Sequence, residues 1–250
     1  LDSNTRRVVY GQSNQPTNLL IASPNSVYRR TLSSNRFNFT GERRPAFLAN
    51  ATNLFNKVWI YNRFIVSNNG NITLNITKFN EYFRYTNINA GIGLPFVGIV
   101  LLSNDEFFLN RIEAHVMNGQ LELANAELQY FLSLRIYDNP SDPLDDFNPV
   151  TDQITIERVT AKYPVIPNEY TPFYPLIDDV QKSYIKAIAE IRRKEFLHEG
   201  LRWFDIKRFA LEVRHEIYNQ PTNILTKNDL RRALQIPLAA SNAGLEKNPR

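Results

Sequence analysis

The pattern of hydrophobic and polar positions changes near Ser103. Before it, residues 1–102 carry short apolar runs such as NLLIAS and KVWIYNRFIV among many Asn, Thr, Ser and aromatic residues. The second run alternates and is rich in β-branched and aromatic side chains, which predicts a strand. The Asn-Gly pair in SNNGNITLNIT indicates a turn between two such runs. We therefore expect residues 1–102 to form an irregular, loop-rich region with a few short strands.

After Ser103 the apolar residues recur at helical spacing. Ser103 and Asn104 are candidate N-caps, and the two acidic residues that follow them are typical of a helix start. Gly119 separates two apolar stripes, which are formed by Phe108, Ile112 and Val116, and by Leu121, Ala124, Leu128, Phe131 and Leu132. This pattern predicts a helical hairpin over residues 103–136, the length of one tetratricopeptide unit.

After residue 136, the residue pattern predicts a long connection followed by two helices. Residues 137–177 contain seven prolines, which favours an extended connection. A helix is expected from Asp178 to Glu199, ended by Gly200 as its C-cap, and a shorter helix from Leu201 to Leu211.

Charge interrupts the apolar stripe of the first of these helices. On a helical wheel of about 100° per residue, Glu195 falls in the middle of the stripe and Glu199 at its edge. An unpaired carboxylate there would cost several kcal/mol of stability. Arg202, Asp205 and Arg208 follow at i, i+3 spacing, and arginine binds carboxylates through two parallel hydrogen bonds. We therefore expect these five residues to form a buried ion network that locks the two helices around Gly200.

Catalysis by the same carboxylates is the alternative interpretation, because His198 lies beside Glu199. Nearby cations lower carboxylate pKa values, which suits a structural pair better than a general acid. The segment also lacks the second His of a zinc-binding helix. We therefore expect no catalytic residue and no metal or other cofactor here.

Composition narrows the possible functions further. The net charge is +4 and the 29 basic residues are scattered, so we expect no nucleic-acid partner. The chain has no cysteine, which excludes disulfides and thiolate metal sites. The longest apolar stretch, IGLPFVGIVLL, is too short to span a bilayer. Five acids in the Pro-rich connection have oxygens suited to calcium, but their spacing fits no EF-hand, and we expect a solvated loop: Asp138, Asp142, Asp145, Asp146 and Asp152.

The segment IRRKEFLHEGLRWFDIKRF, residues 191–209, resembles the C-terminal signature of the SusD/RagB family. That signature is an Arg-rich helix ending in Glu-Leu-x-x-Glu-Gly, followed by Arg-Trp-Phe-Asp-Leu-x-Arg. The matching residues are Arg193, Glu195, Glu199, Gly200, Arg202, Trp203, Phe204, Asp205 and Arg208. The family often has a polar residue, commonly His, where this chain has Leu201.

Three other segments carry the same resemblance. LQIPLAASNAGLEKNPR is similar to the closing Ile-Pro, Asn, Gln-Asn-Pro pattern of the family, with Lys247 in place of the usual Gln. The predicted hairpin over residues 103–136 resembles the tetratricopeptide-like hairpin of the family. ERRPAFL is similar to an Asp-x-Arg segment before its central strands. The resemblance therefore extends over most of the chain, and its specific part is the last seventy residues or so.

The resemblance implies a fold, a location and a function. Family members are surface lipoproteins of Bacteroidetes-type bacteria that cap a TonB-dependent (SusC-like) outer-membrane transporter and pass glycans, or in some branches peptides, to it. The implied fold is mainly α, with tetratricopeptide-like hairpins and an irregular remainder. We expect residues 1–250 to form a single domain of this kind, the C-terminal part of a longer lipid-anchored protein, with the signature region at 178–250.

Ligand residues are not transferred by the resemblance, so they are sought by chemistry. Glycans are held by aromatic rings stacked on sugar faces and by polar side chains in an open cleft. KVWIYNRF and NEYFRYTN combine such residues, and the candidates are Trp59, Tyr61, Arg63, Tyr82, Arg84 and Tyr85. Burial of these aromatic residues in the core is the competing interpretation. YTPFYP, residues 170–175, is a third aromatic segment.

Glycan capture without catalysis is the function that the sequence favours. Peptide capture by a member of the same family is the nearest alternative. An all-α glycan-degrading enzyme would need two carboxylates in an aromatic cleft, and Asp105 with Glu106, or the region of Asp145, are the pairs to test. A tetratricopeptide scaffold that binds only a protein partner is the remaining alternative.

Overall fold

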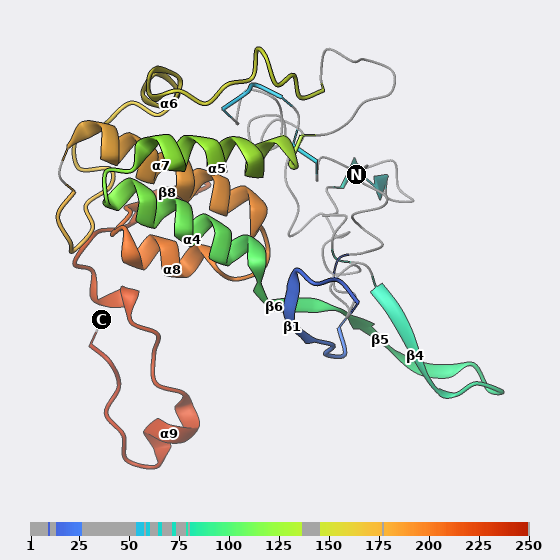
Figure 1. The fold of residues 1–250 in the computed structure, drawn as a ribbon. Coiled ribbons are helices and arrows are strands. Elements are labelled where there is room, and N and C mark those ends of the chain that lie inside the picture. Colours follow the sequence, from blue (N-terminus) through green and yellow to red (C-terminus); the bar gives the residue numbers. More distant parts are fainter. Residues whose placement is uncertain are drawn as a thin grey trace. The chain divides into compact units, whose positions relative to one another are not determined.

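The computed structural model describes residues 10, 14–26, 54–57, 59–60, 65–66, 72–73, 79, 81–136, 146–176 and 178–249 (Figure 1). The chain divides into two compact units, Leu1–Lys162 and Tyr163–Arg250. Each unit is described by itself below.

The fold is mixed, so the expectation of a mainly α protein is wrong. Within the described part of the chain, 37% of the structure is helical and 21% is strand. Between residues 81 and 136, apolar runs before residue 104 form strands, and one pair of helices follows over residues 104–133. Those runs are short and are joined by tight turns, such as the one at Gly91, whose φ is +65°. Two antiparallel strands satisfy their backbone groups at that length, whereas a helix of five or six residues leaves most of its groups unpaired.

Paired antiparallel strands make up the β structure of the first unit. Strand β1 (Asn18–Ala22) pairs with β6 (Ile99–Ser103), and β4 (Glu81–Asn87) pairs with β5 (Ile92–Val97). The short strands β2 (Ile65–Val66) and β3 (Ile72–Thr73) form a third pair. The predicted Asn-Gly turn falls between β2 and β3, where residues 67–71 lie outside the described residues.

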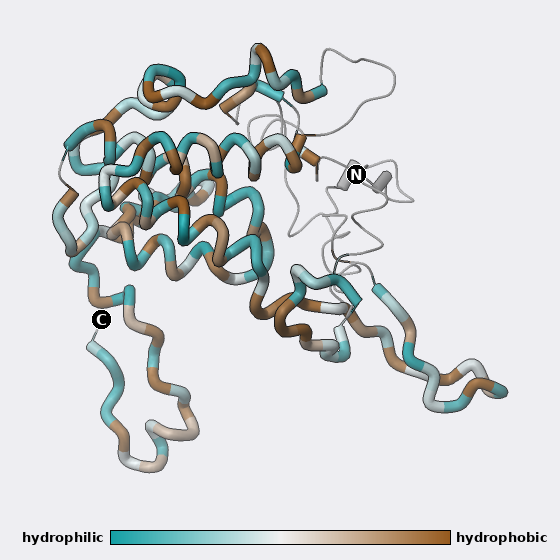
Figure 2. The backbone as a smooth tube through the Cα atoms, in the orientation of Figure 1, coloured by the Kyte–Doolittle hydropathy of each residue, from teal (hydrophilic) through white to brown (hydrophobic). Residues whose placement is uncertain are grey.

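The helical hairpin of the first unit consists of α4 (Asn104–Met117) and α5 (Leu121–Ser133). Ser103 is the N-cap of α4, and its hydroxyl accepts a hydrogen bond from the Glu106 amide at 3.3 Å. Gly119, at φ +72°, makes the turn. Hydrophobic and hydrophilic positions alternate along both helices (Figure 2). Their buried apolar side chains are Leu109, Ile112 and Val116 of α4 and Ala124, Leu128, Phe131 and Leu132 of α5.

An ion pair between the buried Arg135 and the partly exposed Asp105 joins the two ends of this hairpin. The Arg135 Nη2 atom lies 2.7 Å from Asp105 Oδ1, and its guanidinium stacks over the ring of Phe131 at 4.3 Å. The Ile60 amide donates to the Arg135 carbonyl at 2.8 Å. Trp59 forms a β-bridge with Ile136 and is buried beside this connection. Helix α6 (Ile156–Lys162) ends the first unit.

The second unit begins with α7 (Asp179–Glu195) and α8 (Arg202–Arg208). The Asp178 carboxylate caps α7 by accepting from the Gln181 amide at 2.7 Å. Helix α7 ends at Glu195, about one turn before the expected Glu199, because His198 and Gly200 adopt positive φ values of +67° and +85°. The wheel that placed Glu199 on a helical stripe was therefore wrong for that residue.

A strand pair and two short helices complete the second unit: β7 (Val213–Ile217), β8 (Gln220–Leu225), the 3₁₀ helix η4 (Leu230–Arg232) and α9 (Leu238–Asn242). The Arg232 guanidinium connects η4 and the residue after β8 to α8, because it donates to the carbonyls of Thr226 at 2.6 Å and Ile206 at 3.0 Å. In the described residues, no helix combines the length and apolarity that a membrane crossing requires.

Candidate functional site

Asp205 is the centre of a buried ion network in the second unit. It is 1% exposed, and its two carboxylate oxygens accept from Arg192 Nε at 3.1 and 3.2 Å. Arg208 Nη2 adds a third contact to Oδ1 at 3.1 Å. Arg192 lies on α7 and the other two residues on α8. The network therefore joins α7 to α8 across the turn at Gly200.

This arrangement differs from the predicted one in its partners. Asp205 and Arg208 interact as expected, but the second arginine is Arg192, which the sequence analysis did not single out. Arg192 lies four residues after Ile188 and seven after Ile185, on the buried side of α7, and that spacing was its signal. Glu195 is 2% exposed at the end of the helix, whereas Glu199 lies in the turn and is partly exposed.

Arg202, the remaining predicted member, faces a different carboxylate. Its Nη2 atom lies 3.6 Å from Glu190 Oε1, and its Nη1 atom lies 3.4 Å from the Ala189 carbonyl. Both groups belong to α7, so Arg202 also connects the two helices, but on the rim of a pocket.

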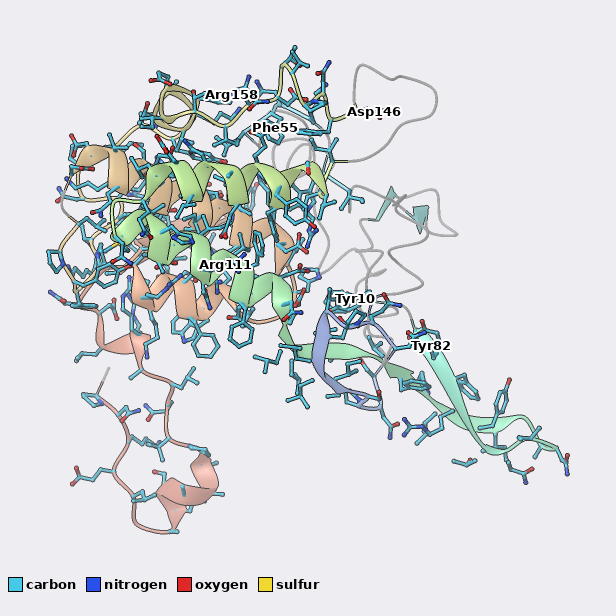
Figure 3. All side chains as sticks on the ribbon, viewed as in Figure 1. Tyr10, Phe55, Tyr82, Arg111, Asp146 and Arg158 are labelled. Atoms are coloured by element: carbon cyan, nitrogen blue, oxygen red, sulfur yellow. The ribbon has the colours of Figure 1, made fainter. Side chains whose placement is uncertain are left out.

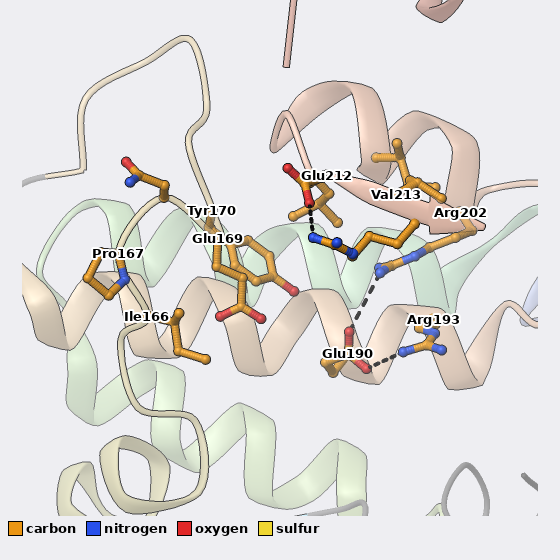
Figure 4. Close-up of a pocket in the computed structure, with 13 residues that line it drawn as sticks. Ile166, Pro167, Glu169, Tyr170, Glu190, Arg193, Arg202, Glu212 and Val213 are labelled. Carbon is orange, nitrogen blue, oxygen red and sulfur yellow. Dashed lines mark hydrogen bonds and ion pairs between the residues drawn. The ribbon is translucent and has the colours of Figure 1, made fainter. Parts of the chain in front are cut away.

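That pocket, which we call the arginine pocket, has a volume of about 720 Å³. Figure 4 shows Glu190 between the guanidinium groups of Arg193 and Arg202, with Tyr170 and Glu169 on the connecting loop and Glu212 and Val213 at the start of β7. The residues that line it are Ile166, Pro167, Asn168, Glu169, Tyr170, Glu190, Arg193, Arg202, Ile206, Leu211, Glu212, Val213 and Arg214. All of them belong to the second unit.

The lining of the arginine pocket mixes both signs of charge with a buried phenol. Arg193 Nη1 lies 3.1 Å from Glu190 Oε2, and Arg214 Nη1 lies 3.1 Å from Glu212 Oε1. Burial raises the pKa of Tyr170, and the negative charge of Glu190 raises it further. Tyr170 therefore stays a neutral hydroxyl, which can donate a hydrogen bond, at every physiological pH.

The β4–β5 hairpin separates the predicted ligand residues onto two faces. Tyr82 lies opposite Phe96 with the rings stacked at 5.6 Å, and the Arg84 guanidinium covers the same Phe96 ring at 4.8 Å. Figure 3 shows Tyr82 on this hairpin. Tyr85 points to the other face, since residues alternate along a strand, and meets Phe83 there at a centroid distance of 5.0 Å.

The second of these faces is an exposed aromatic surface, which we call the aromatic face. Phe83 and Tyr85 are 43% and 56% exposed. Their cross-strand partners are Pro95 and Gly93. A Cβ atom at Gly93 would lie 2.6 Å from the Phe83 ring and 2.3 Å from the Arg84 carbonyl oxygen, so the Phe83 ring lies directly against the backbone of β5. The small partner leaves the outer ring surfaces open.

The other predicted aromatic residues do not form an open site. Trp59 is 1% exposed, so its ring offers no face to a ligand. Tyr61 and Arg63 lie outside the described residues. Of the YTPFYP segment, Tyr170 lines the arginine pocket and packs on Phe209 at 5.8 Å, while Phe173 is exposed with Lys227 Nζ 4.8 Å from its ring centre.

The acidic pairs considered for catalysis or metal binding occupy other surroundings. Asp105 is engaged by Arg135, and Asp145 lies outside the described residues. Asp152 is buried and accepts from the Asn148 amide at 2.8 Å. Among the described side chains, no group of three or more His, Cys, Asp or Glu residues is placed to hold a metal ion.

Comparison of the chain with protein-family models, with curated proteins and with solved structures gave no significant match in any of the three.

Proposed function

We propose that this chain is the glycan-binding part of a non-catalytic surface protein that captures oligosaccharides for a TonB-dependent outer-membrane transporter. The assignment to the SusD/RagB family is part of the proposal and rests on the motif at residues 191–209. A lipid-anchored position at the cell surface and the transporter partner follow from that resemblance.

The observation that carries the glycan part of the proposal is the aromatic face of the β4–β5 hairpin. Phe83 and Tyr85 present open rings beside each other, and sugar rings stack their C–H faces on such surfaces. Asn87, at the end of β4, is exposed; its Oδ1 accepts from the Ala90 amide at 3.1 Å, and its NH2 group can donate to a sugar hydroxyl. An exposed pair of aromatic rings on a two-stranded hairpin is costly in water and is retained more readily when it has a ligand.

Peptide capture by the same family remains the second candidate. The arginine pocket is compatible with peptide capture, because guanidinium groups bind the carboxylates of peptides as well as those of acidic sugars. The aromatic face favours glycans, because Phe83 and Tyr85 lie edge to face on an open strand surface and do not form a deep apolar pocket for a side chain.

Calorimetric titration of the protein with neutral oligosaccharides (maltoheptaose, xylohexaose and mannohexaose) tests this proposal. We expect saturable binding of at least one of them with no released sugar. Phe83→Ala and Tyr85→Ala should each weaken it by roughly 5- to 100-fold, because one stacked aromatic ring contributes about 1–3 kcal/mol by analogy with base stacking.

Tyr218→Ala is the control, because Tyr218 is also an exposed tyrosine, at the turn of the β7–β8 hairpin. It should leave the affinity unchanged. Absence of binding to every glycan in a panel extended to polysaccharides, together with binding of peptides, would replace glycan capture by peptide capture. Sugar release during the titration would replace it by an enzyme.

A further inference from the structure

Among the described cations that line the arginine pocket, Arg202 differs from Arg193 and Arg214 because it has no carboxylate oxygen within hydrogen-bond distance. Each carboxylate of the pocket has a close cationic partner: Glu190 has Arg193 at 3.1 Å, Glu212 has Arg214 at 3.1 Å, and Glu169 has Lys186 at 2.6 Å. Arg202 is different, because its nearest carboxylate oxygen lies 3.6 Å away, beyond hydrogen-bond distance.

The donors of Arg202 are therefore available to a ligand. A guanidinium has five N–H groups, and the polar contacts of Arg202 with described residues are the long ones to Glu190 and to the Ala189 carbonyl at 3.4 Å. Its side chain is 31% exposed, so the group is reachable from solvent but partly shielded from it. Partial burial strengthens a charge-assisted hydrogen bond because water screens it less.

Arg202 offers one positive charge to an incoming anion. Glu190 and Glu212, which also line the pocket, repel a doubly charged group such as a phosphate monoester more strongly than a single carboxylate. The planar fork of arginine matches the two oxygens of a carboxylate.

The remaining lining suits a sugar ring. Ile206 and Val213 are partly buried and offer apolar surface to the C–H face of a pyranose. The Tyr170 hydroxyl stays protonated and can donate to a ring substituent. A volume of about 720 Å³ falls in the range of small-ligand pockets and holds more than one sugar unit.

We propose that the arginine pocket binds a uronic acid unit of an acidic glycan, with Arg202 pairing with the sugar carboxylate through two hydrogen bonds and Tyr170 donating to a hydroxyl. The inference deepens the proposed glycan capture and rests on it. It adds a second contact region, distinct in residues from the aromatic face, and it names the substrate class as acidic.

The test compares trigalacturonic acid with its fully methyl-esterified form by calorimetry at low salt. The two probes share every ring and hydroxyl and differ in the carboxylate charge. We expect the acid to bind at least about tenfold more tightly than the ester, the size of one charge-assisted hydrogen bond. Arg202→Gln should remove that preference.

Lys207→Gln is the matched control, because Lys207 is an exposed cation on the same helix and does not line the pocket. It should keep the tenfold preference. Arg202→Lys keeps the charge without the planar fork and should retain only part of the preference, and it serves as a second variant if Arg202→Gln does not fold. Thermal unfolding of each variant reports on folding.

The outcomes separate this inference from the proposed function. Equal affinity for acid and ester, or a preference that survives Arg202→Gln, overturns the uronic acid site even when neutral glycans still bind through Tyr85. An equal loss in Lys207→Gln would indicate diffuse attraction to the charged surface, not a site. Arg202-dependent binding that prefers a peptide with a free C-terminal carboxylate would overturn the sugar as the ligand.

Discussion

Replacement of Asp205 by alanine should destabilise the protein strongly, because Asp205 accepts hydrogen bonds from two arginines while being 1% exposed. The substitution removes the negative charge and leaves Arg192, which is also buried, without this counterion. The effect therefore tests whether charge in the segment at residues 191–209 has a structural role.

The magnitude follows from the number of donors involved. Arg192 Nε and Arg208 Nη2 each make a charge-assisted hydrogen bond to Asp205, and such bonds contribute about 1.5–3 kcal/mol each. Removal of one partner from a buried ion pair costs about 3–5 kcal/mol, which agrees with that sum. Arg208 is one-third exposed, so Arg208→Ala should cost clearly less than Asp205→Ala.

Urea unfolding followed by circular dichroism measures the difference. With a denaturant dependence of about 2 kcal/mol per molar urea, Asp205→Ala should lower the midpoint by roughly 1.5–2.5 M. Lys182→Ala is the control, because it removes an exposed pair with Asp179 on the same helix α7. That pair should contribute less than about 0.5 kcal/mol.

An Asp205→Ala midpoint within about 0.3 M of the parent protein, with an unchanged denaturant dependence, would refute the structural role. So would equal effects of Asp205→Ala and Lys182→Ala, since Asp205 is buried with two arginine donors whereas the Lys182–Asp179 pair is a single exposed contact.

Three further predictions concern other parts of the molecule. Burial raises the pKa of Tyr163 and Tyr170 in the folded protein above the usual value of about 10. Their contribution to the free energy of unfolding is therefore complete below about pH 10 and is lost as the pH rises above it, because the unfolded chain ionises first. Urea midpoints measured from pH 9 to 11.5 should fall less steeply in a variant with both residues changed to Phe. Gly119→Ala should cost about 1–2 kcal/mol, because φ is +72° there and a Cβ atom would meet no neighbour, so the cost is purely conformational. Gly119→Asn should cost less, and equal melting temperatures of parent and Ala variant would contradict the turn geometry. Arg135→Met should cost about 1.5–3 kcal/mol, as measured by urea unfolding, because it removes a charge-assisted hydrogen bond to Asp105, which is one-third exposed. A double variant with Asp105→Ala should cost less than the sum of the two single changes.

Local signals predicted the helices better than the overall class. The N-cap at Ser103, the turn at Gly119 and the apolar stripes gave both helices of the hairpin to within a few residues. The expected mainly α class was wrong because it was taken from the SusD/RagB resemblance, whereas the described residues are 37% helix and 21% strand. Short runs such as EYFRYTN and IGLPFV become strands only by pairing with each other, and pairing is a property of two segments.

For the candidate sites too, the sequence predicted residue types and strand alternation, and the fold decided which side chains are exposed. Alternation along EYFRYTN separates Tyr82 from Tyr85, but the sequence did not say which face would be open; the opposing Gly93 and Pro95 decided that. Trp59 was a candidate for stacking on a sugar, but it belongs to the core: it is 1% exposed and forms a backbone bridge with Ile136. The arginine pocket was not predicted, since it combines a loop, two helices and a strand.

The sequence by itself determined that buried charge joins α7 to α8 and that Asp205 and Arg208 take part, because charged residues at helical spacing on an apolar stripe must be paired when buried. The tertiary structure decided the partners: Asp205 meets Arg192 and Arg208, and Arg202 turns to Glu190. The physical reason is that positive φ at His198 and Gly200 ends α7 early and fixes the approach of α8. An ion pair requires an approach within about 4 Å, a distance that spacing along one chain segment does not specify once the backbone turns.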